Sequence, residues 1–174
     1  MSDKKWISWW FAFSAVVMSW DSGYLLLRPR SMAGGDLYWL WKPYTFYEQV
    51  DYVYSVQAYE NGEGFAGAQA VMNLIENFVG LSYVFATHIS KSDLAPLIGY
   101  SAATMTTAKT ILYVAQELFC GFCAVGHNEL SVIVKYWAVP NLLWFTVACL
   151  IMYTLGKDIS LSLRRNKAAA NKLE

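Results

Sequence analysis

The chain has 174 residues, of which 56% are hydrophobic and only 15% charged, whereas a soluble domain usually carries about 25% charged residues. Lys and Arg balance Asp and Glu, 13 against 13, which argues against the basic surface of a nucleic-acid-binding protein. The apolar excess falls in four segments, residues 6–27, 65–87, 97–122 and 130–155. Each is long enough to cross a bilayer, which takes about 20 mainly apolar residues. One large soluble core is the alternative, and four such segments in so short a chain argue against it.

Residues 6–27 follow two lysines, as a secretory signal would, but Asp21 and Tyr24 stand where small residues of a cleavage site belong. We therefore interpret this segment as a retained span. The sequence predicts an all-α, four-helix membrane domain over residues 1–160 and a basic cytosolic tail over residues 161–174.

Lys and Arg are distributed unevenly between the two sides of this four-span arrangement. Three bases lie between the first two segments, at Arg28, Arg30 and Lys42, and Lys135 lies just inside the fourth. The other side holds Lys4, Lys5, Lys91, Lys157, Arg164, Arg165, Lys167 and Lys172. The positive-inside rule then places both termini in the cytosol of a multi-pass protein.

The connection between the first two segments, residues 28–64, is too long for a simple connector. Its centre is dense in Trp and Tyr, which favour the membrane–water interface because each ring has an apolar body and a polar tip. We expect a lid across the luminal mouth of the bundle. An anchoring belt with no further role is the alternative interpretation.

Two charged residues, Glu76 and Lys109, lie near the centres of the second and third segments. A charge at the bilayer centre costs about 3 kcal/mol or more. Because helices rise 1.5 Å per residue, up-and-down spans place Glu76, Lys109, Asn141 and Trp144 at a similar depth. The sequence therefore predicts a Glu76–Lys109 ion pair at mid-membrane.

Further polar residues continue from this depth toward the luminal side. Asp21 lies past the centre of the first segment, and Pro140 permits a kink in the fourth. Two helical faces are polar, one with Gln69, Asn73 and Glu76, the other with Thr106, Lys109, Thr110, Tyr113, Gln116 and Glu117. So many polar groups predict a cavity that binds, protonates or deprotonates a ligand. The alternative is an ion pair that only fixes helix packing.

Cys120 and Cys123 have the spacing of a CxxC motif. There is no second CxxC and no nearby His pair, so we interpret them as buried thiols, with a metal or redox site as the alternative, and expect neither a metal nor a cofactor.

Several stretches together resemble the emopamil-binding-protein group, the EXPERA-domain family that includes sterol Δ8–Δ7 isomerases and the sigma-2 receptor. They are residues 109–117, residues 126–129, Asn141 with Trp144, and Trp41 with Tyr44 and Asp51. The resemblance implies four helices around a sterol-shaped cavity in the endoplasmic reticulum membrane. It also implies that Asp21 corresponds to the acid of the first helix, while the second-helix acid matches either Glu76 or Gln69. The isomerases have His in place of Val17 and Asp in place of Thr110.

The sequence and the resemblance together predict an isomerase that shifts a double bond in a sterol or terpenoid-like lipid through a carbocation, with cyclisation in a secondary pathway as a variant. A non-catalytic lipid-binding protein is the alternative, and the oligomeric state, a homodimer included, is left open. Asp21 and Glu76 are the expected catalytic residues. The expected substrate contacts are Gln69, Asn73, Lys109, Thr110, Tyr113, Glu117, Asn141 and Trp144, and the expected lid residues are Trp41, Tyr44 and Asp51.

Overall fold

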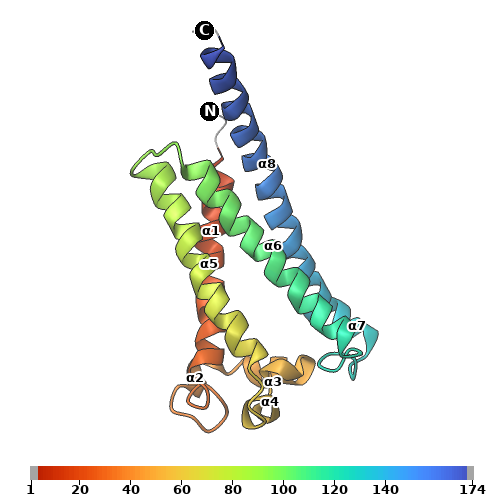
Figure 1. The fold of residues 1–174 in the computed structure, drawn as a ribbon. Coiled ribbons are helices and arrows are strands. Elements are labelled where there is room, and N and C mark those ends of the chain that lie inside the picture. The colour runs from red at the N-terminus through yellow and green to blue at the C-terminus, as the bar shows by residue number, and fades with distance from the viewer. Residues whose placement is uncertain (1–3, 172–174) are drawn as a thin grey trace.

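The computed structural model describes residues 4–171, and all the regular secondary structure within that range is helical. Four long helices run side by side (Figure 1). They are α1 (Lys5–Leu26), α5 (Phe65–His88), α6 (Ala95–Phe119) and a continuous helix, Leu130–Ala170. The last comprises α7 (Leu130–Val132), the π-helical turn η2 (Ile133–Ala138) and α8 (Val139–Ala170). The all-α prediction is confirmed, and each long helix begins within two residues of its predicted segment.

Two of these helices, α5 and Leu130–Ala170, are long and apolar enough to cross a membrane by length and composition. The helices of the first and third predicted spans, α1 and α6, do not meet this criterion of length and composition. The helix α1 contains four Ser and four Trp, and α6 contains four Thr and two Tyr. These residues carry polar atoms and lower the mean hydropathy of a helix. Composition therefore supports two of the four predicted spans.

The helices pack in the order α1, α5, α6, α8, whereas α1 and α8 have no comparable backbone packing on each other. Side chains bridge α1 and α8 instead. Lys4 pairs with Asp158, and Trp10 lies 5.0 Å from Trp144 between ring centroids. Both ends of the described chain lie at the upper end of the bundle in Figure 1, which we call the termini end.

Small residues let the helices approach closely near the termini end. Ala102 and Ala103 are 0% and 1% exposed. A Cβ placed on Gly99 of α6 would lie 2.7 Å from Leu155 Cδ1 of α8. Such close approach maximises van der Waals contact between helices. The core here also contains Ile7, Phe11, Tyr83, Ala86, Ala95, Ile151 and Leu155.

Residues 28–64, which we call the lid, fold into short helices across the other end of the bundle (Figure 1). These are α2 (Tyr38–Trp41), α3 (Tyr44–Val50), the 3₁₀ turn η1 (Tyr52–Tyr54) and α4 (Val56–Glu60). Trp41 fixes α2 to α1, because its indole N–H donates to Trp20 O at 2.8 Å and its ring lies where a Cβ on Gly23 would come within 2.8 Å.

The chain after residue 160 continues α8 without interruption to Ala170, so no structural boundary separates the predicted tail from the domain within the described residues. The last tail residues, 172–174, lie outside the described range.

Candidate functional site

A cavity of about 240 Å³ lies between the helices beneath the lid. Every long helix contributes to its wall, and so do three tyrosines of the lid. The lining residues are Val17, Met18, Trp20, Asp21, Tyr44, Tyr47, Tyr54, Gln69, Asn73, Thr106, Lys109, Thr110, Tyr113, Pro140, Asn141 and Trp144. Nine of the predicted site residues are thus gathered around one space.

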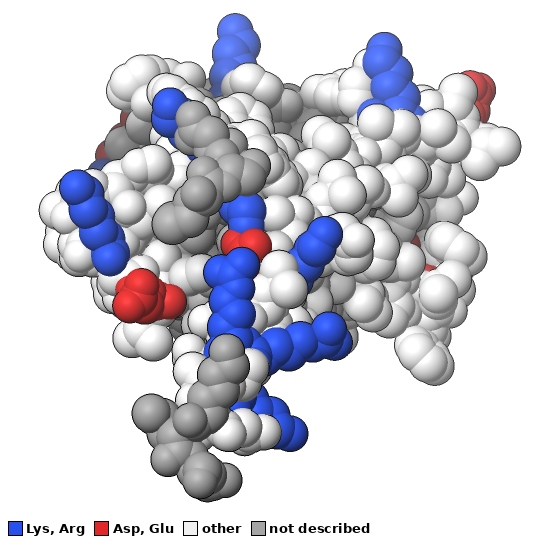
Figure 2. All heavy atoms as spheres, turned by 90° about the horizontal axis from the view of Figure 1, so that it is seen from above, with Lys and Arg blue, Asp and Glu red and all other residues white. Residues whose placement is uncertain are grey.

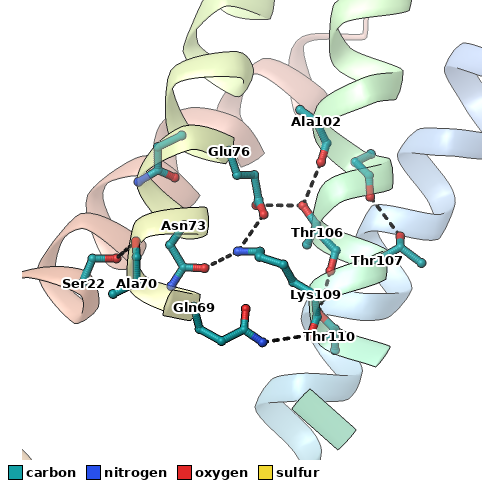
Figure 3. Close-up of polar contacts among 12 residues, drawn as sticks. Ser22, Gln69, Ala70, Asn73, Glu76, Ala102, Thr106, Thr107, Lys109 and Thr110 are labelled. Carbon is teal, nitrogen blue, oxygen red and sulfur yellow. Dashed lines mark hydrogen bonds and ion pairs between the residues drawn. The ribbon is translucent and has the colours of Figure 1, made fainter. Parts of the chain in front are cut away.

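Lys109 and Glu76 form the predicted ion pair, which confirms this part of the sequence analysis (Figure 3). Lys109 Nζ lies 2.8 Å from Glu76 Oε2, and the two side chains are only 12% and 6% exposed. The ammonium also donates to Asn73 Oδ1, and Thr106 Oγ1 donates to Glu76 Oε1 at 2.7 Å. Glu76 therefore lies behind Lys109, and Lys109 rather than Glu76 lines the cavity.

Gln69 and Thr110 flank this pair (Figure 3). Gln69 Nε2 donates to the backbone oxygen of Lys109 at 3.4 Å, and the Thr110 hydroxyl donates to Thr106 O at 2.9 Å. The Thr110 bond is a helix back-bond that leaves the hydroxyl oxygen able to accept one more hydrogen bond.

Asp21 supplies the second carboxylate of the cavity wall. The Tyr44 hydroxyl donates to its Oδ1 at 2.6 Å and the Tyr54 hydroxyl to its Oδ2 at 3.4 Å. Among residues 4–171 no Lys, Arg or His forms an ion pair with Asp21. Its partners are therefore neutral donors from the lid, so the lid and this carboxyl group are coupled.

Asp51 is bonded to Tyr113, which lines the cavity. The Tyr113 hydroxyl donates to Asp51 Oδ2, and the Val53 N–H donates to Oδ1 at 3.2 Å. Asp51 is 1% exposed. Burial raises the pKa of Asp51 to about 6, while the two hydrogen bonds act in the opposite direction. Asp51 therefore holds a cavity-lining tyrosine in place and does not itself line the cavity.

The helix Leu130–Ala170 contributes to the cavity wall near the point where its backbone is irregular. The π-helical turn η2 ends two residues before Pro140, and Asn141 Nδ2 donates to Trp137 O at 2.8 Å. Such π turns occur frequently at functional sites. The indole N–H of Trp144 is buried and has no hydrogen-bond partner in the described chain. Because an unsatisfied buried donor costs about 1–3 kcal/mol, a ligand oxygen at this point would be stabilised.

Glu117 lies away from the cavity, which corrects its expected role as a substrate contact. Its Oε2 accepts the backbone N–H groups of Ala124 and Val125, both at 3.2 Å. It therefore holds the loop after α6. Trp41 is also absent from the cavity wall and acts instead in fixing the lid to α1.

Tyr47 and Tyr54 line the cavity but were not among the expected site residues. The density of aromatic residues indicated that the lid was of interest, but it did not indicate which aromatic rings point into the cavity. The spacing of Tyr44 and Tyr47, three residues apart on the helix α3, was the available signal.

The prediction of buried thiols is wrong. Cys120 and Cys123 are exposed and joined in a disulfide, because the chain turns sharply after α6 and brings their Cα atoms to 5.4 Å. Cys149 is the free cysteine and is half-buried in α8.

Comparisons with known proteins identify no relative of this chain: no family model, no curated protein and no solved structure matches it.

Proposed function

We propose that the chain is a multi-pass protein of the endoplasmic reticulum membrane with four spans and both termini in the cytosol. Large apolar side chains on the outside of the bundle support this. Trp9 of α1, Phe78 of α5 and Leu142 of α8 are 74%, 74% and 63% exposed, and Ile111 and Leu112 of α6 are exposed as well. Large apolar side chains exposed on every long helix are unusual for a soluble monomer.

The charge distribution supports the orientation. Figure 2 looks down on the termini end and shows Lys and Arg side chains gathered there, with few Asp or Glu. The bases at the helix ends and connection on this side are Lys4, Lys5, Lys91, Lys157, Arg164, Arg165 and Lys167. Bases on the cytosolic side are what the positive-inside rule requires.

We propose further that the protein is an isomerase that shifts a carbon–carbon double bond in a sterol or terpenoid-like lipid. Such a shift needs an acid to protonate one alkene carbon and a base to remove a proton from another. The observation that carries the proposal is a carboxyl group, Asp21, in the wall of a cavity formed largely by aromatic and apolar side chains. A carboxyl group can donate the proton, and its tyrosine partners can stabilise the carboxylate that remains. That carboxylate can then accept the proton that leaves the other carbon.

The cation formed by protonation would be stabilised by aromatic faces. Trp20, Tyr113 and Trp144 lie in the cavity wall, and a cation over such a ring gains about 1–2 kcal/mol when desolvated. The charge of Lys109 would oppose a carbocation, but Glu76 at 2.8 Å offsets it. In this proposal Glu76 acts through Lys109, and Asp21 is the acid that meets the substrate.

The cavity size restricts how a lipid would sit. An enclosed cavity of about 150 Å³ holds benzene, so 240 Å³ corresponds to roughly ten non-hydrogen atoms. We propose that the reacting end of the substrate occupies this space. The rest of a sterol or long terpenoid would extend between α1 and α8, where backbone packing is sparse.

A non-catalytic lipid-binding protein is the second candidate, and one observation favours it. Both Asp21 and Glu76 are already hydrogen-bonded or paired within the protein. A site whose polar groups are satisfied can hold a lipid without exchanging protons. The Trp144 indole N–H would then bind the oxygen of a bound sterol or terpenoid.

Expression in a sterol-isomerase-deficient yeast strain, with profiling of its sterols, tests the proposal. An isomerase restores the shifted sterol, and the Asp21→Asn variant does not. Asp36→Asn is the matched control, because Asp36 is 60% exposed in the lid and pairs with Arg30 away from the cavity. Absence of conversion together with micromolar or tighter sterol or terpenoid binding by the purified chain would favour the binding protein.

A further inference from the structure

The disulfide between Cys120 and Cys123 lies at the end of α6, where the chain turns into the 120–129 loop. Both cysteines are exposed. The turn between them uses positive φ angles at Gly121 (71°) and Phe122 (59°). A non-glycine residue is strained there, so the surrounding contacts must hold Phe122 in this conformation.

The 120–129 loop is bonded directly to the lid. The Tyr52 N–H donates to Ala124 O at 3.1 Å, and Asn128 Nδ2 donates to Val50 O at 2.8 Å. The His127 Nε2 lies 2.7 Å from Gln49 O, and the His127 ring stacks on Tyr52 with 3.7 Å between centroids. These contacts surround Asp51, which is bonded to the cavity-lining Tyr113.

The same loop is anchored into the core. Val125 is fully buried and Ala124 is 3% exposed, and both belong to the core cluster that contains Trp41 and Tyr44 of the lid. Their backbone N–H groups are held by Glu117. The disulfide closes the turn that immediately precedes these two residues.

We propose that Cys120–Cys123 is a thiol-exchange site for a dithiol, and that the disulfide holds the lid onto the cavity. A thiolate of the dithiol attacks Cys123 Sγ, the Cys120–Cys123 bond breaks, and the electron pair leaves on Cys120 Sγ. That sulfur already accepts the Cys123 N–H at 3.1 Å, which stabilises the leaving thiolate. The second thiol of the reagent then attacks the reagent's own sulfur in the mixed disulfide, that bond breaks, and the electron pair leaves on Cys123 Sγ. The two cysteines gain two electrons and two protons, and the dithiol becomes a disulfide.

Reduction removes the restraint on a four-residue ring. The loop-closure entropy of so small a ring corresponds to a change of roughly 20-fold in the population of open states. In this proposal the opening includes the Tyr52–Ala124 and Asn128–Val50 hydrogen bonds, because Ala124 directly follows the disulfide-closed turn and Asn128 lies in the same loop. The lid is thereby loosened at Asp51, whether the cavity catalyses a reaction or only binds a lipid.

Hydrogen–deuterium exchange of the full chain in detergent micelles, with and without dithiothreitol, tests this inference. Reduction, verified as a mass gain of about 2 Da, is expected to speed exchange in peptides covering 49–54 and 124–128 by roughly 20-fold. Peptides from α5 and from the termini end of α6 should not change. The Cys120→Ser, Cys123→Ser double variant should show the faster exchange without reductant and ignore its addition.

Cys149→Ser is the matched control, since this cysteine is free and lies in α8. It should retain slow exchange and respond to dithiothreitol like the unmodified chain. Unchanged lid exchange after complete reduction overturns the proposal. So does alkylation of Cys120 and Cys123 in protein that has never met a reductant.

Discussion

The two ends of the helix bundle are stabilised in different ways. Near the termini end the core consists of apolar and small residues such as Ala102, Gly99 and Ile151, which pack closely against one another. Near the lid, the protein buries carboxylates and amides, including Asp51, Asn73, Glu76 and Glu117. Burying a polar group costs free energy unless it is hydrogen-bonded. All four groups are hydrogen-bonded or paired, so the lid end depends on these polar contacts around a cavity. The other end supplies the closely packed scaffold that supports it.

The largest expected effect concerns activity at the lid end. Asp21→Asn keeps the size of the side chain but removes the ionisable proton. If the protein is an isomerase, turnover in microsomes should fall by about 10²–10⁴-fold, while the melting temperature stays nearly unchanged. Unchanged product formation by this variant, with Asp36→Asn as the control, would exclude Asp21 as the acid.

The next effect concerns stability at the Lys109–Glu76 pair. Removing one partner of a buried ion pair leaves an uncompensated charge and typically costs about 3–5 kcal/mol. Lys109→Met alone should therefore lower the melting temperature in detergent more than Lys109→Met combined with Glu76→Gln. A double variant no more stable than the worse single variant would show that the two charges are not coupled.

The pH dependence of the free energy of unfolding should show the titration of Asp51. Its folded pKa of about 6 lies above the ordinary value of 3.8, so the folded state binds the proton more tightly than the unfolded state. The stabilisation from protonated Asp51 is then complete below about pH 4 and is lost as the pH rises through 6, by up to about 3 kcal/mol. Melting curves between pH 4 and 7 should show this slope, and Asp51→Asn should remove it. An identical slope in the variant would assign it to other groups.

The smallest effect is expected in the scaffold. Ile151 is 1% exposed in the closely packed half, and Ile→Val at a buried site typically costs about 1 kcal/mol. Ile151→Val should lower the melting temperature without changing ligand binding or turnover per folded molecule. Leu150→Val is the control, since Leu150 is 52% exposed and should tolerate the change. A loss of activity per folded molecule in Ile151→Val would remove the distinction between scaffold and site.

Much of this division could be predicted from the sequence. Apolar segments gave the long helices, and helical rise placed Glu76 opposite Lys109, because both follow from local periodicity and depth. The contacts of Glu117 with the 120–129 loop, in place of the expected contacts with the cavity, could not be predicted. It depends on a turn whose positive φ angles at Gly121 and Phe122 are set by tertiary contacts.

The lid also has features that only tertiary contacts determine. Its aromatic composition predicted an interfacial segment, but the orientation of Tyr47 and Tyr54 toward the cavity depends on how short helices pack on α1. Likewise, Pro140 indicated a kink, whereas the π-helical turn at Ile133–Ala138 depends on the fit of this helix to α6 and the lid.

Proton transfer within the cavity is the central claim, and heavy water tests it most directly. Microsomes containing the unmodified chain would be incubated in D₂O with a Δ8-sterol and, separately, with unsaturated terpenoids, and the products analysed by mass spectrometry. Protonation at carbon by an exchangeable acid predicts a shifted double bond and one deuterium at the protonated carbon, with both absent in Asp21→Asn. Binding of these lipids without any shift or deuterium in the unmodified chain would contradict the isomerase and leave a lipid-binding protein.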